Sequence, residues 1–92
     1  MQQPHKTDIV LSLKGRDAGA LLLVIAEDET YLYLADGKLR RVEKPKRKKR
    51  IHVSFQGTCD AQTLQKLQQY GRFTNSDIRK ALALWAGEPV SD

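Results

Sequence analysis

The residues of this sequence that could bind a ligand are concentrated in one basic segment, residues 38–50. It holds nine of the sixteen Lys and Arg residues of the chain and one of its eleven acidic residues, Glu43. Its formal charge is therefore +8, whereas the remainder of the chain sums to −3. Cations gathered in this way bind polyanions, because their contacts with phosphates release condensed counterions. The segment predicts a phosphate-binding site, and the alternative interpretation is a solvated, disordered loop without a ligand.

Catalytic or metal chemistry is not indicated by any other part of the sequence. His5, His52 and Cys59 lack the spacing of a metal-ligand set. No phosphate-binding glycine loop, nucleophile elbow or pair of catalytic carboxylates is visible. We therefore expect no enzyme activity, no cofactor and no metal.

The cysteine count and the lengths of the apolar runs indicate the cellular compartment. The single cysteine cannot form an internal disulfide, which fits a reducing compartment. The longest apolar run, Ala20–Ala26, is too short to span a bilayer, and the N-terminal residues lack the apolar stretch of a secretory signal. We expect a cytoplasmic protein of one small domain that does not insert into a membrane.

The first two thirds of the chain have the pattern of short strands. In residues 8–14 and 31–35, similar side chains recur at every second position, so each face of the segment carries its own set. This period of two is typical of half-buried strands. Ala20–Ala26 is apolar without alternation, which predicts a central strand buried on both faces. Two further runs, Leu39–Glu43 and Ile51–Phe55, complete a set of five. Five short strands joined by tight turns predict a small, strongly bent antiparallel barrel.

The predicted turns determine which segments meet. Gly15–Gly19 is a glycine-framed turn, and Asp36-Gly37 is a type I′ hairpin signal. Pro45 argues against a strand through Lys44–Arg50, which is therefore predicted to be a loop. In a simple meander these two turns lie at one end of the barrel. The acidic turn Glu27–Thr30 then lies beside the basic loop at the other end and partly screens its charge.

After residue 57 the periodicity becomes helical. The first helix is predicted to begin at an Asp60 N-cap and to end at Gly71. The second begins with a capping box of Thr74 and Asp77 and ends before Gly87. Its apolar stripe consists of Ile78, Ala81, Leu82 and Trp85. Helices this short are unstable alone in water, so we expect the pair to pack on the barrel.

Three motifs carry a resemblance to a known family. The stretch IVLSLKGRDAGALLLVI, in which Gly15 and Gly19 frame a turn around Asp17, resembles the motif of a KOW domain. The continuation LADGKLRRVEKPKRKKRIH and the later TNSDIRKAL are similar to a narrower group. These are short bacterial KOW-domain RNA-binding proteins related to large-subunit ribosomal proteins of the archaeal and eukaryotic kind. The turn has Ala18 and Ala20 where the family often has cations, so the basic segment is the better candidate for RNA contact.

The resemblance implies a fold and a function. The fold would be a small all-β, SH3-like (KOW) five-stranded barrel over residues 8–55, with a C-terminal helical hairpin over residues 60–87 packed on it. The function would be RNA binding, with ribosomal RNA as the first candidate partner and a ribosomal protein as the second. The predicted RNA-binding residues are Arg16, Lys38, Arg40, Arg41, Lys44, Lys46, Arg47, Lys48, Lys49 and Arg50.

Phosphate contacts position a protein on RNA without reading sequence, so specificity must come from RNA shape or from unpaired bases. Tyr31 and Tyr33 lie on the strand face opposite Leu32 and Leu34. If the leucines are core, the tyrosines are exposed. They then either stack on bases or simply pack against neighbouring side chains.

Three other functions remain open at this point. The first is a protein-interaction module in which the helix face Ile78–Trp85 docks a partner. The second is a nuclear import signal, because PKRKKR has the required composition. The third is attachment to an anionic membrane surface. The bacterial group that the chain resembles argues against the second, and the lack of an apolar anchor beside the basic run argues against the third.

Overall fold

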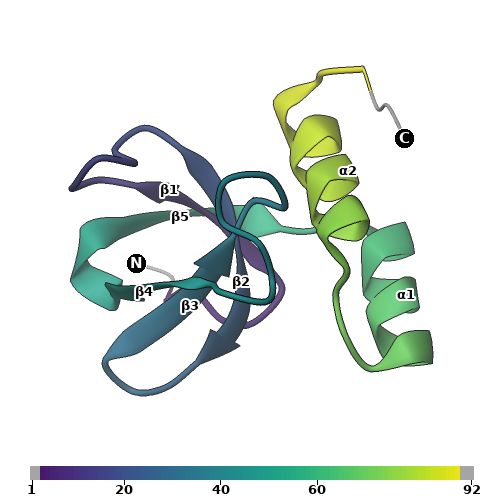
Figure 1. The fold of residues 1–92 in the computed structure, drawn as a ribbon, viewed down its shortest axis with the longest axis horizontal. Coiled ribbons are helices and arrows are strands. Elements are labelled where there is room, and N and C mark those ends of the chain that lie inside the picture. Colours follow the sequence, from purple (N-terminus) through teal and green to yellow (C-terminus); the bar gives the residue numbers. More distant parts are fainter. Residues whose placement is uncertain (1–2, 90–92) are drawn as a thin grey trace.

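The computed structural model of the chain describes residues 3–89, which form a five-stranded antiparallel sheet followed by two α-helices (Figure 1). The strands are β1 (Asp8–Ser12), β2 (Leu21–Glu27), β3 (Tyr31–Ala35), β4 (Lys46–Lys49) and β5 (Val53–Thr58). The helices are the 3-10 helix η1 (Arg50–His52), α1 (Ala61–Tyr70) and α2 (Asn75–Ala86). None of the helices in this range has the length and apolar character needed to cross a membrane.

The sheet is strongly curved but open. Its strand order is β4-β3-β2-β1-β5, and no backbone ladder joins the edge strands β4 and β5 within residues 3–89. In a flat sheet β4 and β1 would lie roughly 14 Å apart, because neighbouring strands are separated by about 4.8 Å. Yet the Lys48 ammonium on β4 donates to Ser12 Oγ at the end of β1 (2.6 Å). Five antiparallel strands and two helices are thus confirmed, whereas closure into a barrel is not observed.

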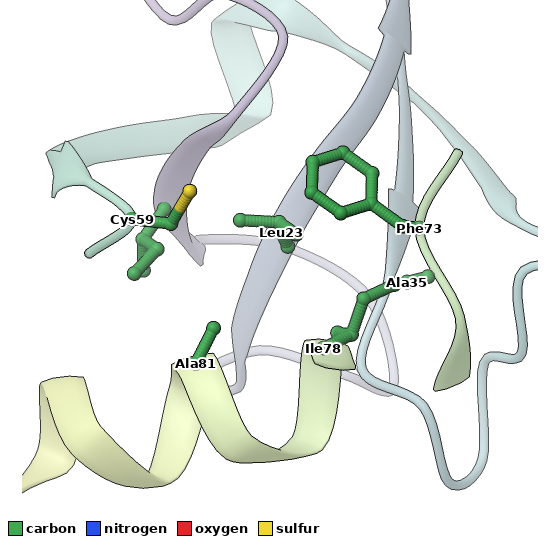
Figure 2. Packing of buried hydrophobic residues seen from close by; sticks show 7 residues of the cluster. Leu23, Ala35, Cys59, Phe73, Ile78 and Ala81 are labelled. Carbon is green, nitrogen blue, oxygen red and sulfur yellow. The ribbon is translucent and has the colours of Figure 1, made fainter. Parts of the chain in front are cut away.

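The core lies on both faces of β2, as its unbroken apolar run predicts. Leu22 and Val24 point to the concave face, where they join a cluster completed by Val10, Leu32, Leu34 and Val53. Leu23 points to the opposite face. There it packs with Ile9, Ala35, Cys59, Phe73, Ile78 and Ala81, of which the last three come from the helical part (Figure 2). Each fully buried Leu or Ile contributes about 1.5–3 kcal/mol, so both clusters are needed in a domain this small.

The helix ends agree closely with the predicted signals. The Asp60 carboxylate accepts from Thr63 N (3.1 Å) at the start of α1, which stops at Gly71 with φ +74°. Thr74 and Asp77 form the predicted capping box at the start of α2. Caps of this kind stabilise a helix by roughly 1 kcal/mol each. They allow two short helices to persist with one packed face.

The region between β3 and the start of β5 departs from the prediction. The expected type I′ hairpin at Asp36-Gly37 and the expected strand Leu39–Glu43 are both absent, and residues 36–45 form a loop. Leu39 is 91% exposed in this loop, whereas Val42 packs against the core cluster that includes Ile78. The expected loop Lys44–Arg50 is also wrong, because Lys46–Lys49 is strand β4. Pro45 directly precedes this strand, where its missing N–H interrupts no ladder.

The last strand is also shifted. Ile51 and His52 belong to η1, so β5 begins at Val53 and continues past Phe55 to Thr58. It pairs with β1 across a register shift between Ile9 and Val10. The alternating pattern of residues 51–55 therefore predicted a strand that begins two residues too early, because Ile51 and His52 lie in the 3-10 turn that joins the two edge strands.

Candidate nucleic-acid interface

The loop of residues 36–45 is anchored to the first turn and a half of α2. Asn75 Oδ1 accepts from Val42 N (2.8 Å), and Asn75 Nδ2 donates to both carboxylate oxygens of Glu43 (3.0 Å each). Arg79 Nη1 donates to Gly37 O (2.7 Å). Two motifs far apart in the sequence, ADGKLRRVE and TNSDIRKAL, are therefore in direct contact. Sequence reasoning assigned no role to Asn75 or Arg79.

Gly37 is the point where the loop and the helix come closest. It has φ +80°, and a Cβ at this position would collide with the backbone carbonyl oxygen of Asn75. Asp36 braces the same turn, since its Oδ1 accepts from Lys38 N (2.8 Å) and Arg40 N (2.9 Å). The loop is thus held at its base. From this base the side chains of Lys38, Arg40, Arg41 and Lys44 extend into solvent.

The loop of residues 36–45 contains four cations and two acidic residues, Asp36 and Glu43, of which Glu43 lies near Arg41. The hydrogen bonds from Asn75 lower the pKa of Glu43, which stays ionised at neutral pH. Its carboxylate lies 3.6 Å from Arg41 Nε, and both side chains are more than half exposed. A pair of this kind contributes little free energy in water. Arg41 therefore remains available to a stronger anion.

Strand β4 separates its basic side chains by face. Residues paired across an antiparallel ladder share a face, and Lys48 pairs with Leu32 while Arg47 pairs with Tyr33. Lys46 and Lys48 therefore share the concave face with the leucine core, and Arg47 and Lys49 lie on the outer face. Arg47 and Lys49 are exposed, and Lys46 is half-buried. The alternation therefore leaves two of the four cations of β4 on its outer face.

Lys48 belongs to the interior and leaves the predicted set of phosphate contacts. Its side chain is 7% exposed, and its ammonium donates to Ser12 Oγ, Lys14 O and Asp17 Oδ1 at 2.6, 2.7 and 2.5 Å. Burial by itself would raise the pKa of Asp17. The hydrogen bonds from Lys48 and Ser12 and the Lys48 charge outweigh this effect, so the pKa lies below its ordinary value. Lys48 thus joins β4 to β1 and to the Gly15–Gly19 turn.

The Arg50 side chain is also bound by other residues of the protein. Its guanidinium donates to Glu27 Oε1 (2.9 Å), to Pro4 O (2.5 Å) and to Asp28 O (2.7 Å). The side chain is 17% exposed. The acidic turn therefore lies beside the end of the basic segment, as the meander predicts. It pairs with Arg50 rather than screening the whole segment.

The carboxylates of the acidic turn have structural partners. A hydrogen bond with His5, another from Lys6 N and a weaker one from Arg50 lower the pKa of Glu27 to about 2. Asp28 Oδ1 accepts from Tyr31 N (2.7 Å) and Thr30 N (2.9 Å), and its pKa is likewise lowered, most by Tyr31 N. Both groups carry full negative charge at neutral pH, at the β3 end that is farthest from the loop of residues 36–45.

Arg16 lies in the Gly15–Gly19 turn and is exposed. Together with Leu39 and Arg40 it lines a hollow of about 450 Å³ between this turn and the loop of residues 36–45. The two turns therefore meet at one end of the sheet, as predicted. We call the exposed basic side chains of the turn, the loop and β4 the basic surface: Arg16, Lys38, Arg40, Arg41, Lys44, Arg47 and Lys49. Lys46, between Lys44 and Arg47 in the sequence, is half-buried on the other face of β4.

In residues 3–89 no three His, Cys, Asp or Glu side chains lie close enough to bind a metal ion. Cys59 is buried in the core beneath α2. Burial, with a smaller effect of the Asp60 charge, raises the pKa of the Cys59 thiol to about 11. At neutral pH it is therefore a poor nucleophile.

Comparison with known proteins assigns no family, since no family model and no curated protein matches the chain. The function therefore has to be argued from the chemistry of the basic surface.

Proposed function

We propose that the protein binds structured RNA through the basic surface, and that ribosomal RNA is its first candidate partner. The observation that supports this is seven exposed cations on one turn, one anchored loop and one strand. Within residues 3–89, Arg41–Glu43 is the only salt bridge that these seven side chains make. Cations without acidic partners release RNA counterions without first giving up a bond of their own.

The fold also favours the resemblance to KOW domains. We propose that the curved sheet is a variant of the SH3-like KOW barrel whose seam, between β4 and β5, lacks a backbone ladder. Three features favour this: the strand order, the 3-10 turn linking the edge strands, and the Lys48 bridge from β4 to β1. Gly15 and Gly19, which frame the family's turn, have φ of +90° and +88°, values that side-chain-bearing residues rarely adopt.

Each part of the surface would contribute differently. Arg side chains bind a phosphate with two parallel hydrogen bonds, whereas Lys acts as a mobile point charge. The loop is anchored at its base by Asn75 and Arg79, so its side chains move while their backbone stays in place. Anchoring of this kind lowers the entropy lost on binding. Four to six phosphate contacts would give a slope of log affinity against log salt of roughly −3 to −5.

The test is a salt titration of binding to structured ribosomal RNA, with single-stranded and double-stranded RNA of equal length as controls. The variant Arg40→Ser/Lys44→Ser removes two exposed loop cations. The matched control, Lys6→Ser/Arg72→Ser, removes two exposed cations from other parts of the molecule. Both variants have the same net charge. We expect the loop variant to flatten the salt slope by about one to two, and the control to leave it nearly unchanged.

Two results would refute the proposal. Equal effects of the two variants would mean that net charge alone attracts RNA, without a defined site. Absence of binding at physiological salt in the wild-type protein would remove RNA as the ligand.

Docking of a protein on the helix face Ile78–Trp85 has less support. Ile78 and Ala81 are buried against the sheet, and the ring of Trp85 covers Gly57 of β5. Ile78, Ala81 and Leu82 are therefore already packed within the protein, and Trp85 is the one residue of the stripe that stays substantially exposed, at 43%. Removing the helices would uncover Ile9 and Leu23, so surface variants test the two functions better than truncation.

A further inference from the structure

Two tyrosines and an arginine share the outer face of β3 and β4. Tyr31, Tyr33 and Ala35 alternate onto this face of β3, and Arg47 pairs across the ladder with Tyr33. The helical part buries the face at Ala35, which packs with Phe73 and Ile78 (Figure 2). Tyr31 and Tyr33, further from the helices, remain half-exposed. We call Tyr31, Tyr33 and Arg47 the stacking platform.

The platform is held in place by its surroundings. The Arg47 guanidinium carbon lies over the Tyr31 ring, 4.4 Å from its centroid. The Tyr33 hydroxyl donates to Asp28 Oδ2 (3.2 Å), while Asp28 Oδ1 accepts from Tyr31 N (2.7 Å). One carboxylate thus fixes both the backbone and a ring of the aromatic pair. Rigid aromatic groups bind a planar ligand at low entropic cost.

The charge around the platform changes sign along β4. Arg47 and Lys49 lie on the platform face, and the cations of the loop precede them in the chain. Beyond the far end of the strand lie the ionised carboxylates of Glu27 and Asp28. An RNA backbone that follows the cations along β4 therefore meets negative charge at the β2–β3 turn. A nucleotide at that end is better bound through its neutral base than through its phosphate.

We propose that the stacking platform binds an unpaired base of RNA, stacked on the Arg47–Tyr31 pair. This inference rests on the proposed function and specifies which RNA is preferred. A base within a duplex is stacked on both faces, so only a loop, bulge or strand end can offer one. Aromatic and guanidinium planes accept any base, which gives a preference for unpaired structure rather than for sequence.

The experiment compares two RNA hairpins with the same stem and the same number of phosphates. One has a loop of adenosines, and the other has a loop of abasic sugar-phosphates. Stacking of one base predicts that the wild-type protein binds the adenosine loop about 5- to 150-fold more tightly. Tyr31→Leu should lose this preference and bind the abasic hairpin as the wild type does. Tyr31→Phe, which keeps the ring, should retain the preference.

A second variant guards against an effect of Tyr31 on folding. Arg47→Lys changes an exposed residue, keeps the charge and removes the plane, so it should reduce the preference without flattening the salt slope. If the wild type binds both hairpins equally with a steep salt slope, the platform is refuted while the proposed function stands. If neither hairpin binds, the proposed function fails with it. Loss of the preference in Tyr31→Phe would show that the hydroxyl, and not stacking, is responsible.

Discussion

The buried ammonium of Lys48 makes the sharpest prediction about stability. In Lys48→Met the side chain keeps its length and apolar stem, but Ser12, Lys14 O and Asp17 all lose a donor. Asp17 is affected most, because its Oδ2 is already buried without a hydrogen-bond partner among the described residues. Removing one partner of a buried ion pair costs about 3–5 kcal/mol. The Asp17 side chain is 21% exposed, so we expect a lower cost of about 2–4 kcal/mol.

Urea unfolding followed by the fluorescence of Trp85 measures this cost. A loss of 2–4 kcal/mol corresponds to a decrease in melting temperature of roughly 10–25 °C for a domain of this size. The double variant Lys48→Met/Asp17→Asn removes the charge that Lys48→Met leaves unpaired. It should recover a large part of the loss, and the double-mutant cycle should give a coupling of at least about 1 kcal/mol.

The pH dependence gives an independent check with a definite sign. The pKa of Asp17 is lower in the folded state than in the unfolded state. Ionised Asp17 therefore stabilises the fold at any pH above its ordinary pKa, and this contribution is lost as the pH falls through the folded-state pKa. The gap between wild type and Lys48→Met should therefore shrink at acid pH. A cost of less than about 0.5 kcal/mol at neutral pH would refute the interior role of Lys48. It would return this residue to the candidate phosphate contacts.

Three further changes test the anchored loop and the acidic turn. Gly37→Ala should cost about 2–4 kcal/mol in urea unfolding, because its Cβ collides with the Asn75 carbonyl oxygen as well as straining φ; Gly19→Ala, with similar φ and open space, should cost only about 1 kcal/mol. Asn75→Ala should raise the hydrogen-exchange rate of the Val42 amide at least tenfold, and unchanged exchange would contradict the anchoring. The pKa of Glu27 is lowered from 4.5 to about 2, so ionised Glu27 stabilises the fold above about pH 4.5, and this contribution is lost as the pH falls from 4.5 to about 2. In Glu27→Gln the free energy of unfolding should no longer change with pH through this group, which acid titration of the unfolding free energy measures.

The elements predicted correctly are those whose signals lie within a few residues. The apolar run that forms β2 is buried on both faces because every position in its centre is apolar, whichever way it points. The capping box at Thr74 and the glycine stops at Gly71 and Gly87 act through backbone groups of their own helix turn. Such signals need no information from the rest of the chain.

Residues 36–50 could not be interpreted in this way. Asp36-Gly37 has the composition of a tight hairpin, but the conformation of Gly37 is decided by α2, which packs against it from far along the sequence. KRKK has little intrinsic preference for a strand. It becomes β4 because β3 presents an unpaired edge and because Asp17 neutralises Lys48, the buried lysine of the inner face, while Ser12 accepts a hydrogen bond from it.

The sequence by itself determined the concentration of positive charge at residues 38–50, the strands β1, β2 and β3, and the two capped helices. Only the tertiary structure decided which cations face solvent. Lys48 and Arg50 became parts of the fold, whereas Arg16 joined the basic surface from a turn well before it in the chain. The reason is physical. Charge and periodicity are properties of neighbouring residues, whereas the exposure of a side chain depends on partners brought close by a curved sheet.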